Sequence, residues 1–322
     1  MLNKIKSNII LRKIFKISNY FNNLRLLKYN KNLKRRLDIT LKDYILYNQI
    51  EIDVILNPSF NDKNNFINIK ETDKKFYRFY INKKEIKNNY IANKTKKKKI
   101  KVIINRKITS LKALFKNCKN IIQINFIKFK RENFYDMSEM FFGCNSLYKL
   151  NLEKIKTNNV IDMSNMFDGC SLLTELNLSN FDTANVKDMS FMFYRCSNLK
   201  KLDITNFNTS NVTNVRNMFN ECFSLSEINL KNFNTSEITD MTGLFCECKS
   251  LENIIGINNF VTNNVKEMNY LFYGCIKLKS LSGIKFVINK KTKVKHMFLN
   301  CNQELINKIK KHNKYFPSDA FI

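Results

Sequence analysis

The sequence has few residues that break regular structure: it contains six glycines and two prolines among 322 residues. Most of its turns must therefore be made by Asn, Asp and Ser, whose side chains bond to nearby backbone groups. It also lacks any run of about 18 uncharged apolar residues, so we expect no transmembrane span. The basic N-terminal stretch has only a short apolar run and no small-residue cleavage site of the kind that ends a signal peptide. These absences predict a cytoplasmic location. The basic run NKTKKKKIK, residues 93 to 101, has the composition of a nuclear localisation signal and leaves the nucleus as an alternative.

Sequence motifs of enzymes are missing as well. Only two histidines occur, His296 and His312, and neither belongs to a catalytic or metal-binding pattern. The sequence contains no phosphate-binding GxxxxGK[ST] loop, GxGxxG turn, GxSxG elbow or HExxH zinc motif. We therefore expect a protein that is not an enzyme, with no catalytic residues, no cofactor and no metal site.

Positive charge is concentrated in the first third of the chain. The formal net charge is +29, and residues 1 to 117 contain 30 Lys and Arg against 8 Asp and Glu. Such asymmetry is typical of contact with nucleic acid or an anionic membrane. The chain is also crowded with Lys, Asn, Ile, Phe and Tyr, all of which have A/T-rich codons, so coding bias is a second source of the lysine. Because no nucleic-acid-binding motif accompanies the charge, basic-surface binding is kept as an alternative only.

A repeat with a period of 26 residues occupies most of the remaining chain. Cysteine marks each copy at a spacing of 26 residues, with a single spacing of 27. The eight markers are Cys118, Cys144, Cys170, Cys196, Cys222, Cys248, Cys275 and Cys301. Leu or Met stands four residues before each marker, and Phe stands three residues before it. Eight copies in register predict a solenoid or another repeat array.

One repeat is expected to contain a short strand, a turn and a short helix. In LKKLDI, residues 199 to 204, the apolar residues have the spacing LxxLxL, which suits a short strand whose alternate residues point inward. The next stretch, NFNTSNV, has turn composition, and an Asp or Asn such as Asn214 caps the first turn of a helix. A spacing typical of one helix face appears at Val212, Val215, Met218, Phe219 and Cys222. The predicted fold class is therefore α/β, a solenoid in which each repeat buries its apolar face against the next.

The repeat resembles that of a known family. FDTANVKDMSFMFYRCSNLKKLDITNF, residues 181 to 207, is similar to the 26-residue leucine-rich repeat of BspA-like surface proteins, and the similarity covers residues 100 to 301. This resemblance implies a leucine-rich repeat solenoid of eight repeats. It also implies a binding or adhesion scaffold at the cell surface, whereas the missing signal peptide predicts an intracellular protein.

The marker cysteines are predicted to be structural. Equivalent residues of adjacent repeats lie about 5 Å apart with parallel Cα–Cβ bonds, whereas a disulfide needs converging Cβ atoms about 3.8 Å apart. A straight column also cannot supply four ligands that converge on zinc. We therefore expect buried, reduced cysteines, and an exposed thiol at Cys246, which lies off the repeat. The Thr and Asn columns, represented by Thr183 and Asn206, are expected to bond to the backbone of the turns.

Residues 1 to 43 form a basic segment with helical periodicity, and three interpretations of it stay open. It is a helical cap on the repeats, or a basic amphipathic helix on an anionic membrane. The third interpretation comes from ILRKIFKISNYFNNLRLLKYNKNL, residues 10 to 33, which resembles an F-box. This resemblance implies a substrate receptor of a ubiquitin ligase that binds the ligase adaptor through residues 8 to 40. The implied contact residues are Ile10, Leu11, Ile14, Phe15, Leu24 and Leu27.

Two further segments flank the repeats. Residues 44 to 99 contain the stretches IEIDVIL, FINI and FYRFYI, which predict strands of a β-rich capping module. The solenoid occupies residues 100 to 301. Residues 302 to 322 contain Leu305, Ile306, Ile309 and Phe316, which suit a C-terminal capping helix.

The outward surface of the strands is the predicted binding surface. Leucine-rich solenoids commonly bind partners on an extended face. The predicted contact residues are Tyr148, Lys149, Thr174, Glu175, Lys200, Lys201, Asp203, Ser226, Glu227, Asn229, Glu252 and Asn253. Because both signs of charge occur among them, a protein partner of unknown identity fits better than a polyanion. We therefore expect a protein-binding scaffold, with the ubiquitin-ligase receptor and the basic-surface binder as alternatives.

Overall fold

The computed structural model describes positions 32, 35 and 37 and the ranges 48–58, 65–91, 98–105, 108–281, 283–284, 286–312 and 316–322. The chain divides into two compact units, residues 1–49 and residues 50–322. The strands and the helix α5 belong to the second unit. All six residues of the predicted adaptor contact lie outside the described residues, as does most of the segment from 8 to 40.

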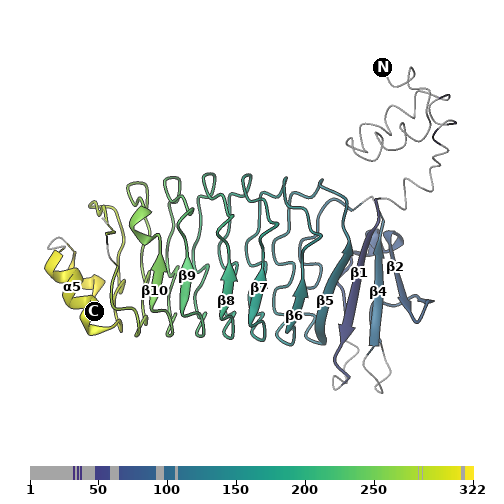
Figure 1. Cartoon of the computed structure of the whole chain (residues 1–322), viewed down its shortest axis with the longest axis horizontal. Helices are drawn as coiled ribbons and strands as arrows, with labels where there is room; N and C mark the ends of the chain where they lie inside the picture. Colours follow the sequence, from purple (N-terminus) through teal and green to yellow (C-terminus); the bar gives the residue numbers. More distant parts are fainter. Residues whose placement is uncertain are drawn as a thin grey trace. The chain divides into compact units, whose positions relative to one another are not determined.

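A six-stranded sheet begins the second unit (Figure 1). Its strands are β1 (Ile50–Leu56), β2 (Tyr77–Ile81), β3 (Lys84–Ile86), β4 (Lys98–Ile104), β5 (Ile121–Lys128) and β6 (Lys149–Asn151). Their order is β3-β2-β4-β1-β5-β6; the pairs are antiparallel except β5–β6, which is parallel. On β1, the completely buried Ile50, Ile52 and Val54 alternate with less buried residues, so one face of the sheet packs on the core.

The FINI stretch, residues 66–69, does not form the expected strand. Phe66 and Ile67 are completely buried. The backbone N–H of Asn68 donates to the Leu114 carbonyl at 2.7 Å, and its side-chain amide donates to the Lys116 carbonyl at 2.6 Å. A 3-10 helix, η2 (Glu71–Phe76), then leads into β2. The stretch is therefore used to tie the sheet to the first repeat rather than to extend the sheet.

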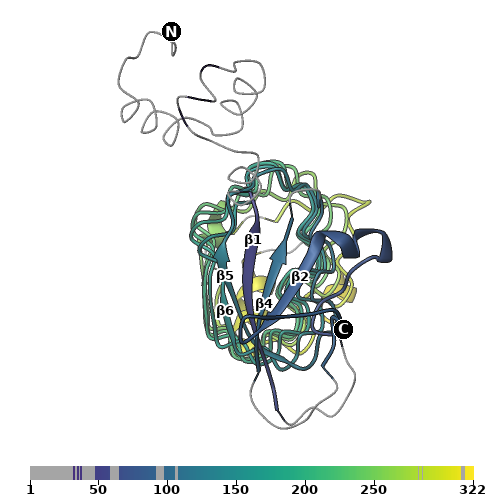
Figure 2. The same cartoon turned by 90° about the vertical axis from the view of Figure 1, so that its right-hand side faces the viewer.

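Successive repeats lie side by side along the rest of the unit (Figure 1). Their strands are β7 (Glu175–Asn177), β8 (Lys201–Asp203), β9 (Glu227–Asn229) and β10 (Asn253–Ile255). The pairs β7–β8 and β9–β10 are parallel, and Leu176 lies opposite Leu202, the equivalent residue of the next repeat. Isolated parallel bridges also pair equivalent residues of successive repeats, from Asp136 with Asp162 to Glu267 with Lys293. Seen along the row, the repeats overlay one another (Figure 2).

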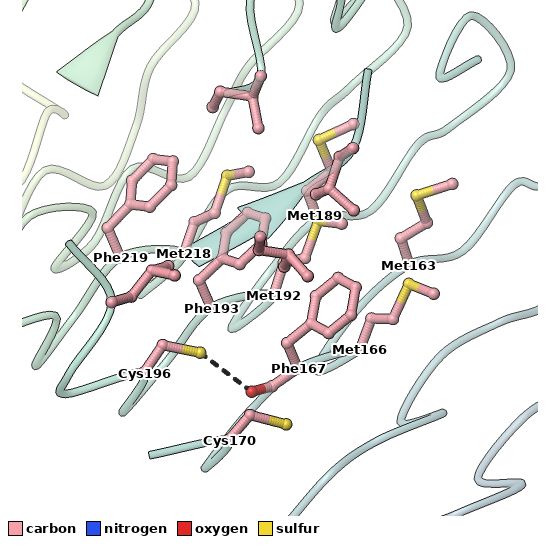
Figure 3. Packing of buried hydrophobic residues seen from close by; sticks show 14 of the residues in the cluster. Met163, Met166, Phe167, Cys170, Met189, Met192, Phe193, Cys196, Met218 and Phe219 are labelled. Carbon is pink, nitrogen blue, oxygen red and sulfur yellow. Dashed lines mark hydrogen bonds between the residues drawn. The ribbon is translucent and has the colours of Figure 1, made fainter. Parts of the chain in front are cut away.

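The apolar columns of the repeat form the core of this row (Figure 3). Phe167, Phe193 and Phe219 are completely buried. Their rings stack with centroids 5.6 Å apart and interplanar angles of 6° and 3°. Met192 and Met218 are completely buried beside them. Because each side chain packs on its counterpart in the neighbouring repeat, one repeat alone would expose this apolar face to water.

The short helix predicted in each repeat does not form. Residues 190–195 are consecutive turns in which two kinds of backbone bond alternate. Met192 and Tyr194 donate to carbonyls three residues earlier in the same repeat. Phe193, which lies between them, donates to the carbonyl of Met218 in the next repeat at 2.9 Å. An α-helix instead bonds every N–H to the carbonyl four residues earlier, so the apolar spacing was correct but its interpretation as a helix was wrong.

Backbone angles explain why these turns cannot become helical. Phe191 and Arg195 have φ values of 57° and 56°, in the left-handed region that interrupts a right-handed helix. The aspartate predicted to cap that helix, Asp188, instead holds a turn, and its carboxylate accepts the N–H of Ser190 at 2.7 Å. The described part of the chain is thus mostly sheet and turn, with few helices. The prediction of an α/β fold with one short helix in each repeat was therefore wrong in its helices.

The polar columns satisfy the buried turns as predicted. The Thr183 hydroxyl is 1% exposed and donates to the Asn208 carbonyl at 2.9 Å. The same hydroxyl oxygen accepts the N–H of Asn208 at 2.8 Å. The side-chain amide of Asn206 donates to the Phe181 carbonyl at 2.7 Å. These bonds join neighbouring repeats, so the polar columns reinforce the stacking of the apolar ones.

The repeat with the longer spacing contains a 3-10 helix, η3 (Ile257–Asn259). Gly256 precedes it with a φ of 85°. A Cβ atom at this position would lie 2.5 Å from the Cα of Lys231, so both the backbone angle and the space require glycine.

The last repeat is followed by α5 (Gln303–His312) and a 3-10 helix, η4 (Ser318–Ala320). Leu305 and Ile309 of α5 are buried. The ring of Phe321 stacks on Phe298, the last phenylalanine of the core column, with centroids 5.5 Å apart. The C-terminal segment therefore covers the apolar surface that the final repeat would otherwise leave open.

Candidate binding surface

The predicted contact residues lie on and beside β6 to β10. Lys149 is on β6, Glu175 on β7, Lys201 and Asp203 on β8, Glu227 and Asn229 on β9, and Asn253 on β10. The residues that directly precede these strands are Tyr148, Thr174, Lys200, Ser226 and Glu252. Asn229 is half-buried and the other predicted side chains are exposed. The twelve positions therefore all lie in, or directly before, the strands β6 to β10.

Strand pairing arranges the outward residues in columns. Gln123 lies opposite Lys149, Glu175 opposite Lys201, and Glu227 opposite Asn253. The described strands β6 and β7, and β8 and β9, are not paired, but the 26-residue period makes the six residues equivalent. The first column is thus Gln123, Lys149, Glu175, Lys201, Glu227 and Asn253, and its charged members alternate in sign. A second column, two residues further along each strand, runs Asn125, Asn151, Asn177, Asp203, Asn229 and Ile255. The surface is polar, ordered and mixed in charge.

Several of these charged groups already have polar contacts with neighbours. The side-chain amide of Asn253 donates to the Glu227 carboxylate at 2.9 Å. The hydroxyl and backbone N–H of Thr205 donate to the Asp203 carboxylate at 2.7 and 3.0 Å. These two hydrogen bonds lower the pKa of Asp203. Asp203 therefore stays charged at neutral pH, and the columns present fixed rather than freely moving polar groups.

The cysteine column is structural, as predicted. From Cys144 onward, each marker thiol donates to the carbonyl of a core phenylalanine in the preceding repeat, as Cys196 does to Phe167 at 3.2 Å (Figure 3). Burial raises the pKa of Cys222 to about 12. Because the thiolate is the reactive form, this column offers no nucleophile at neutral pH. Cys246, which was expected to be exposed, is half-buried, and burial raises its pKa to about 12 as well.

His296 serves the packing of the C-terminal end. Its ring centroid lies 5.2 Å from that of Tyr270, and its Nδ1 atom contacts the Ile322 carbonyl.

Among the residues that the structure describes, no three His, Cys, Asp or Glu side chains gather in an arrangement suited to a metal ion. None of the helices in the described ranges combines the length and the apolar character that crossing a bilayer requires.

One surface feature was missed from the sequence. A depression of about 580 Å³ lies on the six-stranded sheet, where Lys99 and Lys101 of β4 meet Asp53 of β1. The sequence signal was the alternation in KIKVII, which places Lys99, Lys101 and Ile103 on one face and Ile100 and Val102 on the other. The pairing of β4 between β1 and β2 has no comparable signal, so the depression itself was not predictable.

Comparisons with known proteins give a family. The profile of a family described as "Mycoplasma protein of unknown function, DUF285" matches residues 83–202, 109–226 and 195–312. A leucine-rich repeat protein from Bacteroides ovatus ATCC 8483, known from a crystal structure, is 18% identical over 63% of this chain, with a TM-score of 0.35. The aligned region spans 58% of that protein's chain. No curated protein matches the sequence. Since the overlapping matches extend from residue 83 to residue 312, the chain belongs to the DUF285 family of Mycoplasma proteins.

Proposed function

We propose that the chain is a non-enzymatic, protein-binding scaffold of the leucine-rich repeat type. Its repeats coil as a solenoid, and its partner contacts the outward columns of β6 to β10. The partner is a folded protein rather than a polyanion, because the charged members of the first column alternate in sign. Repeat arrays of this kind build extended surfaces from residues that are far apart in sequence.

The parallel register of the strands is the observation that carries the proposal. Glu175 lies opposite Lys201 and Asn177 lies opposite Asp203, so equivalent side chains of adjacent repeats stand side by side. Neighbouring strands are about 4.8 Å apart, and five of them span roughly 20 Å, a length comparable with one side of a standard protein interface. A partner protein would therefore contact a line of side chains along this surface rather than insert into a closed pocket.

Electrostatic pattern is the expected source of specificity on this surface. Alternating charges favour a partner that carries the opposite alternation and disfavour one of uniform charge. A nucleic acid would place phosphates next to Glu175 and Glu227 as well as next to Lys201. The same arrangement therefore attracts a matching protein surface and repels a polyanion.

Site-specific photo-crosslinking in the native cell tests the proposal. A photoreactive amino acid is placed at Lys201 or at Glu227, in the first column, and at the control position Lys187, which is exposed but lies outside the strands. We expect one protein to be crosslinked from positions 201 and 227 and to be absent from the control. A Glu227→Lys change should then weaken the crosslink from position 201. Crosslinks from position 187 alone, or crosslinks to nucleic acid, would contradict the proposal.

A further inference from the structure

The outer face of the six-stranded sheet contains a depression whose lining combines basic and apolar side chains. Its volume is about 580 Å³, and its lining includes Asp53, Lys83, Lys99, Lys101, Ile103 and Ile127. These residues come from β1, β4, β5 and the turn between β2 and β3. We call this depression the sheet groove.

Strand alternation places these side chains at the groove. Ile100, Val102 and Ile104 of β4 are completely buried on the inner face of the sheet. The intervening residues Lys99, Lys101 and Ile103 must therefore face outward. Pairing then brings Lys101 opposite both Asp53 and Tyr80, so that a tyrosine, a lysine and an aspartate form one row across three strands.

The lysines of the groove keep the capacity to bind another anion. The Lys99 ammonium lies 2.7 Å from the Asp53 carboxylate, and its side chain is 64% exposed. The Lys101 ammonium lies 2.6 Å from Glu51, and its side chain is 45% exposed. An ammonium has three N–H donors, so one carboxylate contact leaves donors for a ligand. Lys83 makes no ion pair with any described residue and is exposed at the mouth of the groove.

Apolar surface lies beside these charges. Ile127 is 45% exposed, and Ile103 lines the same depression. Ile127 is the penultimate residue of β5, where the pairing with β1 is irregular, and its side chain stays in contact with water unless another molecule covers it. The groove thus offers a place for one apolar side chain next to cationic groups.

We propose that the sheet groove binds an extended acidic peptide segment of a partner protein, with an apolar side chain placed against Ile103 and Ile127. Charge complementarity favours this occupant, since three lysines line the groove against one aspartate. Asp53 can accept a backbone N–H from a peptide, whereas a phosphate backbone has no such donor to offer it. The inference goes beyond the proposed scaffold function, because it concerns a different surface and a defined ligand chemistry.

The groove is continuous with the outward columns of the repeats. Asp53 lies opposite Asn125 on β5, and Asn125 lies opposite Asn151 on β6. A peptide segment in the groove can therefore belong to a partner that also contacts the strands. The two surfaces remain separable, because their contact residues differ.

Fluorescence polarisation with the full chain tests the groove. The probe is a labelled peptide of about ten residues, made of glutamates around a central leucine. The test variant is Lys83→Glu/Lys99→Glu, and the matched control is Lys187→Glu/Lys266→Glu, which makes the same change in net charge at exposed residues away from the groove. We expect saturable binding that the groove variant weakens at least about tenfold and the control leaves within about twofold.

Four further measurements make the result specific. Replacing the central leucine by serine should weaken binding, as should moderate salt, and a single-stranded RNA of the same net charge should bind more weakly than the peptide. Equal loss in both variants, no saturable binding, or tighter binding of the RNA would overturn the inference. A Lys201→Glu variant that keeps peptide binding would show that this site is independent of the strand columns.

Discussion

The Cys196 thiol donates a hydrogen bond to the carbonyl oxygen of Phe167, which is 29 residues earlier in the chain and one repeat away, at 3.2 Å. Both residues are completely buried. The same bond recurs from Cys170 to Phe141 and from Cys222 to Phe193. Each cysteine therefore fills a small apolar site and also satisfies a carbonyl that faces the core.

Replacing Cys196 by alanine should destabilise the chain. The change removes a buried sulfur, leaves a small cavity and takes away one of the two donors to the Phe167 carbonyl, which keeps the N–H of Cys170 at 3.0 Å. We expect a cost of about 1 to 2 kcal/mol, mostly from the cavity. The free energy of unfolding, measured by urea titration, checks this value. Cys246→Ala is the control, since Cys246 is half-buried and lies off the repeat. An equal loss at both positions would contradict a structural cysteine column.

Replacing Phe191 by asparagine should stabilise the chain. Phe191 has a φ of 57°, whereas the equivalent positions of the adjacent repeats are Asn165 and Asn217. The left-handed region costs a bulky residue about 1 kcal/mol more than asparagine. The loss of the edge-on contact with Tyr194, whose ring centroid is 5.6 Å away, offsets part of that gain.

A matched variant separates these two effects. Phe191→Val loses the same ring contact but gains no relief of the backbone, because β-branched residues disfavour positive φ. We expect the thermal midpoint to rise for the asparagine variant and to fall for the valine variant. Equal midpoints for the two variants would show that the backbone angle is not the deciding factor.

Replacing Thr183 by valine should remove a buried bridge between two repeats. The hydroxyl of Thr183 both donates to and accepts from the backbone of Asn208. Valine has nearly the same shape but leaves the partly buried N–H and carbonyl of Asn208 without the Thr183 hydroxyl, at a cost of about 1 to 2 kcal/mol. Thr213→Val is the exposed control, and denaturant unfolding should show little change for it. A small effect at Thr183 would mean that water replaces the hydroxyl.

Asp168 is predicted to make stability depend on pH. This carboxyl is 8% exposed, and burial is the main reason that its pKa rises to about 7. The carboxylates of Glu221 and Glu139 raise the pKa further, while Arg195 and Lys116 lower it. In the unfolded chain an aspartate has a pKa of about 3.9. Between about pH 4 and pH 7 the folded chain therefore binds more protons than the unfolded chain, and stability falls as the pH rises.

Replacing Asp168 by asparagine removes this pH dependence. Above pH 7 the variant should be more stable than the natural chain by on the order of 2 kcal/mol, since it no longer holds a buried charge. The advantage should shrink as the pH falls and should be nearly gone at pH 4, where the folded carboxyl is protonated and the unfolded one is about half protonated. Urea titrations from pH 4 to pH 8 check this. A difference that stays constant with pH would contradict the raised pKa.

The inward columns were predictable from the sequence because they repeat a residue type at one position. Phe193, Met192 and Cys196 are completely buried, as expected, and Thr183 bonds to backbone as expected. The prediction of a short helix in each repeat was wrong because the same apolar spacing also fits a row of consecutive turns. Glycine and asparagine at positive φ, as at Gly243 and Asn217, were the signal that distinguishes the two.

Other features depend on contacts that the repeat does not encode. The raised pKa of Asp168 arises because one copy of a repeat position is an acid, while Tyr194 and Phe142 stand at that position in the neighbouring copies. The sheet groove depends on the pairing of β4 with β1 and β2, neither of which is next to β4 in the order of strands along the chain. Neither a period nor an alternation within one strand specifies such non-local pairing.

Removal of one whole repeat tests most directly whether the 26-residue units stack as interchangeable modules. Deleting residues 183 to 208 joins Asp182 to Thr209 and keeps every column in register. Deleting residues 183 to 195, half a repeat, joins the wrong positions and places turns against strands. The measurement is urea unfolding of both full-length deletion variants, followed by circular dichroism. Module stacking predicts that the whole-repeat deletion unfolds cooperatively and that the half-repeat deletion does not; equal damage from the two deletions would contradict it.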